Sequence, residues 1–393
     1  MTDYVRDPEI NRLIQQLNGD DAIDGATMAE VPEEDRAPAE RLRQLLSDMV
    51  RHNATDLLVI AGAPATFRIH GELRSFGPAL TGTDVQSIFQ LQITPRRSQR
   101  LENDGAADFS IVLQNETAEK RQRRFRVNLH RQRGELAAAI RALPVEIPSL
   151  SQLNLPASLA ELVTTNRGLI LVCGPTGAGK TSTLAALLGE INSRRSKHII
   201  TIEDPIEYEH RDIKSIVEHI EVGRDAPSFA SALRAALRQD PDVILVGEMR
   251  DLETVQTALT AAETGHLILS TLHTSDAAQA INRIVDVFPA KQQGQIYRQL
   301  SLSLHAVLCQ QLLPRIDEKG RVPAMELLLA TYAVRSHIRS EKLQNLYNEM
   351  TLGKRLGMVT MEDSLTELVR KGLISREEAL SRTARPDEVR NLA

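Results

Sequence analysis

The 393-residue sequence has no tryptophan, 5 tyrosines, 7 phenylalanines and 2 cysteines. With so few aromatic side chains, its cores must be aliphatic, and recognition of nucleic acid by stacked aromatic rings is not expected. Cys173 and Cys309 form neither a disulfide framework nor, by themselves, a zinc site, which fits a reducing compartment. No apolar run reaches the roughly 18 residues typical of a membrane-spanning helix. These absences favour a cytoplasmic protein.

No signal peptide is expected, since the first residues, MTDYVRDPEI, have neither a basic nor an apolar segment. Hydrophobic residues make up 42% of the chain and charged residues 25%, a balance typical of folded globular proteins. At the usual size of about 100–200 residues per domain, the length predicts two domains.

Negative charge is concentrated at the beginning of the chain. Residues 1–40 hold 11 aspartates and glutamates but 3 arginines, whereas the net charge of the whole chain is −5. We therefore expect residues 1–39 to form a flexible acidic extension. The rest of the chain is close to neutral, which gives it no general attraction to nucleic acid.

Residues 40–144 combine a helical pattern with short strand patterns, which predicts an α+β domain. The helix is expected to start near Ala39, because apolar residues such as Leu42 and Leu46 recur at helical spacing. A stretch with three prolines follows, so residues 145–157 are expected to link the two domains. The predicted strands are 57–62, 66–71, 108–113 and 124–129, with a polar hairpin at 115–123.

In residues 158–383, continuous apolar runs alternate with longer helical segments. Such runs are typical of strands buried on both faces of a mostly parallel sheet, so we expect an α/β domain. From about Tyr297 onward the chain is predicted to be helical throughout, and residues 384–393 are expected to form a tail. The predicted strands are 168–173, 198–202, 242–246 and 266–271.

A motif for binding phosphate lies at 174–181. Its sequence GPTGAGKT fits G-x-x-x-x-G-K-[ST] completely, and it stands between a predicted strand and a predicted helix, as the motif requires. Backbone N–H groups of such a loop and the helix amino terminus bind phosphate oxygens. We expect Lys180 to reach the β- and γ-phosphates of ATP and Thr181 to hold Mg²⁺. The predicted nucleotide-binding residues are Gly174, Pro175, Thr176, Gly177, Ala178, Gly179, Lys180, Thr181, Ser182 and Glu203.

Acidic residues follow two of the predicted strands. Glu248 comes just after 242–246, at the sheet edge where the phosphate loop is expected, so it is a candidate to orient Mg²⁺ or water. Glu207 follows another strand and is a candidate to polarise the attacking water, with Glu203 or Asp204 ordering the surroundings of the metal. For this second group, the alternative is a capped turn before a helix.

Other polar residues mark the strand ends. Asp240 and Asp242 stand at the amino end of their strand, where we expect them to form the turn that enters it. His266 and His273 flank the last predicted strand, and His273 lies just past its carboxyl end, where it could sense the γ-phosphate. A plain structural role is the alternative for both histidines. No nearby cysteine or third histidine completes a zinc site.

The segment 120–133 holds seven basic residues and no acidic residue. Three explanations stay open: a solvated hairpin, a nucleic-acid surface, or arginines that stabilise the γ-phosphate charge across a domain or subunit boundary. Phe125 is the only aromatic residue within it, so recognition of RNA by stacking is not favoured.

Four segments follow one another along the chain: GPTGAGKT, ITIEDPIEYEH, LRQDPDVILVGEMRD and TGHLILSTLHT. In order and separation they resemble the Walker A loop, aspartate box, Walker B segment and histidine box of the type II/type IV secretion ATPase superfamily. Within it they resemble the PilT-type ATPases of type IV pilus retraction (twitching motility), over roughly residues 40–383. The resemblance implies a PAS-like α+β amino-terminal domain, followed by a RecA-like P-loop NTPase domain with a helical carboxyl-terminal region.

The resemblance also assigns roles to particular residues. Arg126 and Arg141 correspond to amino-domain arginines that reach the nucleotide phosphates, and Arg133 is a further candidate. Thr181, through ATP, and Glu248 are the implied contacts to Mg²⁺. The implied catalytic residues are Glu207, Glu248, Arg126, Arg141, His266 and His273.

Two features favour the retraction branch of the superfamily. The extension and secretion ATPases usually carry a tetracysteine zinc subdomain and a further amino-terminal domain, and this chain has neither a CxxC motif nor room for that domain. In addition, AVRSHIR at 333–339 resembles the AIRNLIRE segment of the retraction ATPases, with differences at Ser336, His337 and Ser340.

From the resemblance we expect a hexameric, ATP-hydrolysing motor at the cytoplasmic face of the inner membrane. Its expected partners are copies of itself, an inner-membrane pilus platform protein and related motor ATPases, with no nucleic acid and membrane association only through partners. Three alternatives stay open: a sister secretion or pilus-assembly ATPase, a RecA-like nucleic-acid motor, and a non-hydrolysing, nucleotide-gated regulatory protein.

Overall fold

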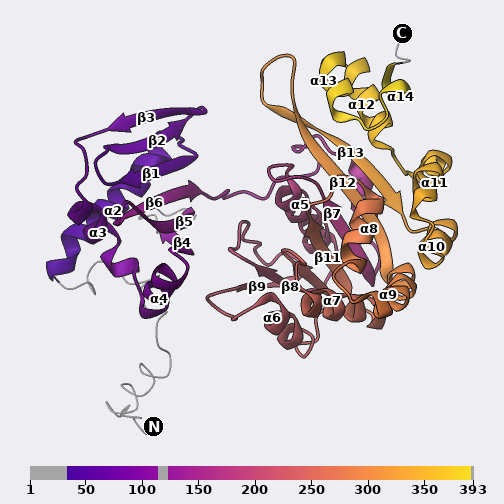
Figure 1. The fold of residues 1–393 in the computed structure, drawn as a ribbon, viewed down its shortest axis with the longest axis horizontal. Helices are drawn as coiled ribbons and strands as arrows, with labels where there is room; N and C mark the ends of the chain where they lie inside the picture. Colours follow the sequence, from indigo (N-terminus) through magenta and orange to yellow (C-terminus); the bar gives the residue numbers. More distant parts are fainter. Residues whose placement is uncertain (1–32, 114–122, 391–393) are drawn as a thin grey trace, which may run out of the picture. The chain divides into compact units, whose positions relative to one another are not determined.

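A computed structural model describes residues 33–113 and 123–390. The chain divides between Val145 and Glu146 into two compact units (Figure 1). The predicted linker 145–157 is not a bare connection, because Leu150 and Leu155 are buried in the core of the second unit. Most of the predicted extension 1–39 and of the polar hairpin 115–123 lies outside the described residues.

The first unit is built around an antiparallel sheet, with the strand order β3-β2-β1-β6-β5-β4 among the described residues. The four predicted strands are confirmed as β1, β2, β4 and β5, whereas β3 and β6 were not predicted. The elements are α2 (Glu33–Arg51), β1 (Asp56–Ile60), β2 (Ala65–Ile69), β3 (Glu72–Phe76), α3 (Gly82–Phe89), η2 (Gln90–Gln92), α4 (Pro95–Asn103), β4 (Ala106–Leu113), β5 (Arg123–Gln132) and β6 (Glu135–Ala142).

Side chains of this sheet alternate between a covered and a polar face. On β5, Phe125, Val127 and Leu129 are fully buried and share a core with residues of α2, α3 and α4. The intervening residues, Arg126 among them, are only partly buried, as the period of two along a strand requires. Helix α2 begins at Glu33, earlier than the predicted start near Ala39, so the last residues of the expected flexible extension are helical.

The second unit is an α/β domain with the strand order β13-β12-β7-β11-β10-β8-β9. All neighbours are parallel except β12 and β13. The elements are η3 (Ala157–Val163), β7 (Gly168–Cys173), α5 (Lys180–Arg194), β8 (His198–Glu203), β9 (Ile216–Glu221), α6 (Phe229–Ala236), β10 (Val243–Val246), α7 (Leu252–Thr264), β11 (Leu267–Leu272), α8 (Ala277–Val285), α9 (Ala290–Ser303), β12 (Leu304–Pro314), β13 (Arg321–Leu329), α10 (Tyr332–Arg339), η4 (Leu343–Asn345), α11 (Leu346–Leu352), η5 (Gly353–Leu356), α12 (Met361–Arg370), α13 (Arg376–Arg382) and α14 (Pro386–Arg390).

The central strands β7, β10 and β11 are buried on both faces, which explains their continuous apolar sequences. On β7, Leu169 and Leu171 face the core formed with α6 to α11, whereas Ile170 and Val172 face the core formed with α5 and η3. Helices therefore cover the sheet on both sides, and the predicted α/β class is confirmed (Figure 1). Among the described residues, no helix is both long and apolar enough to span a bilayer.

The prediction of a helical region from Tyr297 onward was wrong for 304–329. This stretch forms the antiparallel strands β12 and β13, which extend the sheet beyond β7. A short apolar run cannot be assigned to helix or strand by periodicity alone, and here pairing with β7 decides for a strand. The helices α10 to α14 follow these strands.

The two faces of the first unit predict different responses to the same substitution. Leu129→Ala empties a fully buried position of β5 and is expected to lower the free energy of unfolding by about 2–5 kcal/mol. Leu73→Ala on β3, where the side chain is 53% exposed, should cost no more than about 1 kcal/mol. Urea unfolding measures both, and equal costs would contradict this assignment of the core.

Candidate active site

The phosphate loop 174–181 joins the end of β7 to the start of α5. Gly174 and Gly179 have φ angles of 146° and 87°, which residues other than glycine rarely adopt. A β-carbon at Gly174 would lie 2.3 Å from the backbone oxygen of Gln310, a residue of β12. The loop therefore packs directly against β12, and its conformation requires glycine.

Lys180 lies at the end of this loop and is buried, with 8% of the residue exposed. Its Nζ donates to the carbonyl oxygens of Gly174 at 2.8 Å and Pro175 at 3.0 Å. Burial lowers the pKa of Lys180, while Cys173, Glu207 and Glu248 act in the opposite direction. The structure thus brings both predicted catalytic carboxylates close to the loop lysine.

Glu248 follows β10 at the same edge of the sheet. The hydroxyl groups of Ser270 and Thr271 on β11 donate to the carbonyl oxygens of Val246 at 2.7 Å and Gly247 at 2.6 Å. These bonds hold the backbone that leads to Glu248. Its Oε2 lies 2.8 Å from Nη2 of the exposed Arg250.

Glu207 lies in the segment that follows β8. Its backbone N–H donates to Oε2 of the buried Glu203 at 3.4 Å. The hydroxyl groups of Tyr208 and Ser182 are 2.8 Å apart, which ties this segment to the first turn of α5. Glu203, Glu207 and Ser182 therefore belong to one group beside the phosphate loop.

The two predicted histidines lie at opposite ends of β11. His273 is at the end near the loop, where burial, Lys180 and Arg250 lower its pKa. His266 is at the amino end, where its Nδ1 is 3.1 Å from the carbonyl oxygen of Ala261. At about 3.3 Å per residue, the six-residue strand separates them by about 20 Å. Within this chain, His273 lies near the loop and His266 does not.

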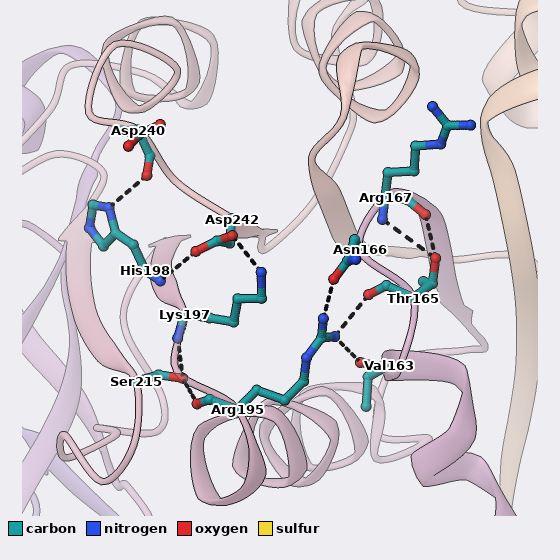
Figure 2. A network of polar contacts seen from close by, with 10 residues as sticks. All are labelled: Val163, Thr165, Asn166, Arg167, Arg195, Lys197, His198, Ser215, Asp240 and Asp242. Atoms are coloured by element: carbon teal, nitrogen blue, oxygen red, sulfur yellow. Dashed lines mark hydrogen bonds and ion pairs between the residues drawn. The ribbon is translucent and has the colours of Figure 1, made fainter.

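Asp240 and Asp242 lie at the amino end of β10, as predicted (Figure 2). Asp242 accepts hydrogen bonds from Lys197 Nζ at 2.7 Å and from the His198 backbone at 3.0 Å. Burial opposes its ionisation, but these bonds outweigh burial and lower the pKa of Asp242. Asp240 has a positive φ of 55°, and its carbonyl oxygen is 3.3 Å from His198 Nδ1. Both aspartates serve the turn that enters the strand.

Figure 2 also shows how the far end of α5 is fixed. Arg195, which follows the helix, donates to the carbonyl oxygens of Val163 at 2.8 Å and Thr165 at 2.9 Å, and it binds the side chain of Asn166. Helix α5 is therefore held at both ends. Its amino terminus, which carries partial positive charge, keeps its place beside the phosphate loop.

The predicted arginines lie on the sheet of the first unit. Arg126 on β5 and Arg141 on β6 stand directly opposite each other in the antiparallel register. Arg141 Nε is 2.8 Å from Asp56 Oδ1, and Arg126 Nη2 is 3.6 Å from Asp108 Oδ1. Arg133 lies apart from this pair, in the turn between the two strands.

The donor set near the loop suits magnesium bound together with a nucleotide. Thr181, with its hydroxyl group, is the second residue of α5, and Glu248 follows β10 at the same sheet edge as Lys180. Mg²⁺ prefers such oxygen ligands and usually keeps waters and phosphate oxygens as its remaining ligands. The residues present therefore fit a Mg·ATP site.

Sequence reasoning missed Gln310, which lies on β12 and contacts the phosphate loop. The region was predicted to be helical, and no local motif marks this glutamine. Its pairing with the loop depends on the contact between β12 and β7, which joins distant parts of the sequence.

The fold and the loop together define a P-loop nucleotide-binding protein. A family model described as "Type II/IV secretion system protein" matches residues 32–390, and the chain belongs to this family. It is 41% identical to the type IV pilus retraction ATPase PilT of Pseudomonas aeruginosa, over 88% of this chain and 99% of that protein. It is 43% identical to a twitching motility protein of Neisseria gonorrhoeae, over 82% of this chain and 85% of that protein.

A solved structure extends this similarity to the fold. The crystal structure of the pilus retraction motor PilT with bound ADP superposes with a TM-score of 0.80 at 45% identity. The match covers 88% of this chain and 98% of that chain. The expected fold class, with α and β elements in two units and helices at the carboxyl-terminal end, agrees with this relative.

The close approach at Gly174 predicts the effect of a single methyl group. Gly174→Ala places a β-carbon against the Gln310 carbonyl and is expected to abolish ADP binding and to lower the melting temperature. Gly189→Ala is the matched control, because its β-carbon would meet only Ile147 at 3.6 Å within α5. It should keep ADP binding and stabilise the helix by up to about 1 kcal/mol. Calorimetry measures both, and ADP binding by the Gly174 variant would contradict the geometry.

A buried histidine near the site makes folding depend on pH. His210 stacks on His219 with ring centroids 6.0 Å apart, and its Nδ1 has no hydrogen-bond partner within the described part of the chain. Burial, followed by the charge of His219, lowers the pKa of His210 from 6.5 to about 4. In the folded protein it therefore stays neutral at pH values where the unfolded chain binds a proton.

The contribution of His210 to stability is fully present above about pH 6.5 and is lost as the pH falls towards 4. Relative to His210→Phe, the wild-type free energy of unfolding should decrease by about 3 kcal/mol across this window. Urea unfolding at several pH values tests this, and parallel pH profiles of the two proteins would contradict a neutral, buried His210.

Proposed function

We propose that this chain is the ATP-hydrolysing motor of type IV pilus retraction. The observation that carries the proposal is the phosphate loop with Lys180, on which Glu207 and Glu248 act electrostatically, in a chain similar to PilT over 88% of its length. Members of its family are ATPases, and this chain is one of them. The identity to retraction ATPases supports pilus disassembly as the work that hydrolysis drives.

In the proposed mechanism, the loop 174–181 binds the phosphates of ATP through its backbone N–H groups and Lys180. Thr181 and Glu248 would hold Mg²⁺, which neutralises phosphate charge when bound. Glu207, together with Glu248, orients a water molecule in line with the γ-phosphate. His273, close to Lys180, senses that phosphate. Glu203 supports Glu207 through its backbone N–H.

We assign Arg126 and Arg141 to the charge that develops on the γ-phosphate. They stand side by side on one sheet and carry fixed positive charges, as arginine fingers do. His266 belongs to the histidine box but stands at the other end of β11. Its proposed role therefore does not involve contact with the phosphate loop of the same chain. The proposed domains are 40–144 and 158–383, with hydrolysis changing the angle between them.

The proposed assembly is a homohexamer at the cytoplasmic face of the inner membrane. It would act on a membrane-embedded pilus platform protein, alongside related motor ATPases, and would bind the membrane only through such partners. A related secretion or pilus-assembly ATPase is the alternative. It is favoured by His337, which differs from the retraction pattern and pairs with Glu349 at 3.1 Å. Restored twitching in cells that lack their own retraction ATPase would favour retraction.

The test of the enzyme is phosphate release from Mg·ATP by the purified chain. Glu207→Gln and Glu248→Gln are each expected to lower kcat by at least about a hundredfold, because the water and Mg²⁺ lose their carboxylate partners. ADP binding should remain in both variants, since the loop is untouched. Glu209→Gln is the matched control, because Glu209 is an exposed neighbour in the same segment, and its kcat should stay unchanged.

Light scattering on the same samples should give the mass of a hexamer, and DNA or RNA should leave turnover unchanged. A chain that binds ATP without any turnover would support the regulatory alternative instead. Turnover stimulated by nucleic acid would support the nucleic-acid motor. Normal kcat in both glutamine variants would refute the assignment of Glu207 and Glu248.

A further inference from the structure

Strand β12 places Gln310 beside the phosphate loop. The strand runs parallel to β7 with Cys309 opposite Cys173, the last residue before the loop. Gln310 and Gly174 are the next residues along the chain after this pair. A β-carbon on Gly174 would lie 2.3 Å from the carbonyl oxygen of Gln310. The position of Gln310 is thus set by the sheet itself.

The side chain of Gln310 then turns towards the loop and α5. Its Nε2 donates to the carbonyl oxygen of Ala178 at 2.6 Å, and its Oε1 accepts from Thr183 Oγ1 at 2.8 Å. The residue is 3% exposed, so both bonds lie away from water. A flipped amide would place two oxygens against each other at Ala178, so these partners determine its orientation.

Holding the Ala178 carbonyl also orients the following N–H. The peptide bond between Ala178 and Gly179 is trans, so its C=O and N–H point in opposite directions. With the carbonyl held by Gln310, the Gly179 N–H points away from β12, towards the other side of the loop. Arg321 on β13 supports the same turn through a 3.4 Å bond to the Gly177 carbonyl.

We infer that Gln310 is a positioning residue of the phosphate loop, which holds the Ala178–Gly179 peptide in the orientation that binds nucleotide phosphate. Thr183 keeps the Gln310 amide in place from α5. This inference rests on the proposed nucleotide site. It adds a strand outside the four motifs to that site, because β12 supplies the contact that local sequence does not.

The test compares ADP binding by calorimetry, KM and kcat for Mg·ATP, and the melting temperature. Gln310→Glu keeps the size of the side chain but replaces the donor with an oxygen that repels the Ala178 carbonyl. We expect ADP affinity to fall by about ten- to a hundredfold, since small misplacements of binding groups cost this much. KM should rise similarly, with kcat changing less than about threefold, because ground state and transition state use the loop alike.

Gln311→Glu is the matched control. It makes the same chemical change one residue further along β12, where the side chain points to the other face of the strand, and its ADP affinity should stay within about twofold of wild type. Thr183→Val removes the hydroxyl that holds Gln310 and should weaken ADP binding severalfold, whereas Thr183→Ser should restore it.

Each outcome decides the inference. A folded Gln310→Glu variant with wild-type ADP affinity and KM overturns it. If that variant does not fold, the Thr183 pair decides, and equal ADP affinities of the valine and serine variants overturn it as well. If the wild-type chain itself binds no ADP, the proposed nucleotide site is wrong. If the wild-type chain binds ADP and the variants bind it equally well, only the role of Gln310 is wrong.

Discussion

The close contact between β7 and β12 is the constraint on which the site depends. The two strands pair in parallel up to Cys173 and Cys309, and the Gln310 carbonyl then occupies the space where a side chain on Gly174 would begin. The phosphate loop therefore starts against a strand rather than in solvent. The same loop has positive φ angles at Gly177 and Gly179, and Lys180 is buried with its Nζ donating to the Gly174 carbonyl oxygen. A glycine whose role looks local in the sequence is required by a strand more than a hundred residues away.

A second consequence comes from the parallel sheet. The carboxyl ends of β7, β8, β10 and β11 meet at one edge, so the loop, Glu207, Glu248 and His273 gather there although they are spread along the chain. Burial alone would disfavour the charge on Lys180, and the two carboxylates counteract it. Opposite charges on rigid strand ends form a site whose groups are oriented before a substrate binds, which is the arrangement that phosphoryl transfer requires.

Much of this architecture could be predicted from the sequence. Strands buried on both faces appear as continuous apolar runs, and the loop motif is contiguous, so β7, β8, β10, β11 and the position of Lys180 followed from local patterns. Strand β12 was not predicted, because it follows α9 with no proline or glycine at the junction and a short apolar run fits either structure. Once β12 was taken as helix, its antiparallel partner β13 was missed as well. The role of Gln310 could not be predicted either, because its two hydrogen-bond partners, Thr183 and Ala178, lie 127 and 132 residues away in the sequence. His266 shared a motif with His273, but the length of the strand between them separates the two rings.

Strand β13, which was also not predicted, contacts the start of α8. On β13, Glu326 lies opposite Cys309 and accepts a hydrogen bond from the Ala277 backbone at 2.9 Å, at the first residue of α8. Helix α8 begins just after the segment that carries His273. Burial raises the pKa of Glu326 to about 7, the Ala277 bond opposes this, and Asp276 and Glu362 add to the rise. Because β12 contacts the phosphate loop and β13 contacts the start of α8, this antiparallel pair fixes the spacing between the loop that binds phosphate and the segment that bears His273. The sheet edge that carries the phosphate loop therefore depends on the whole sheet, because β12 and β13, which lie outside the four motifs, contact the loop and the start of α8.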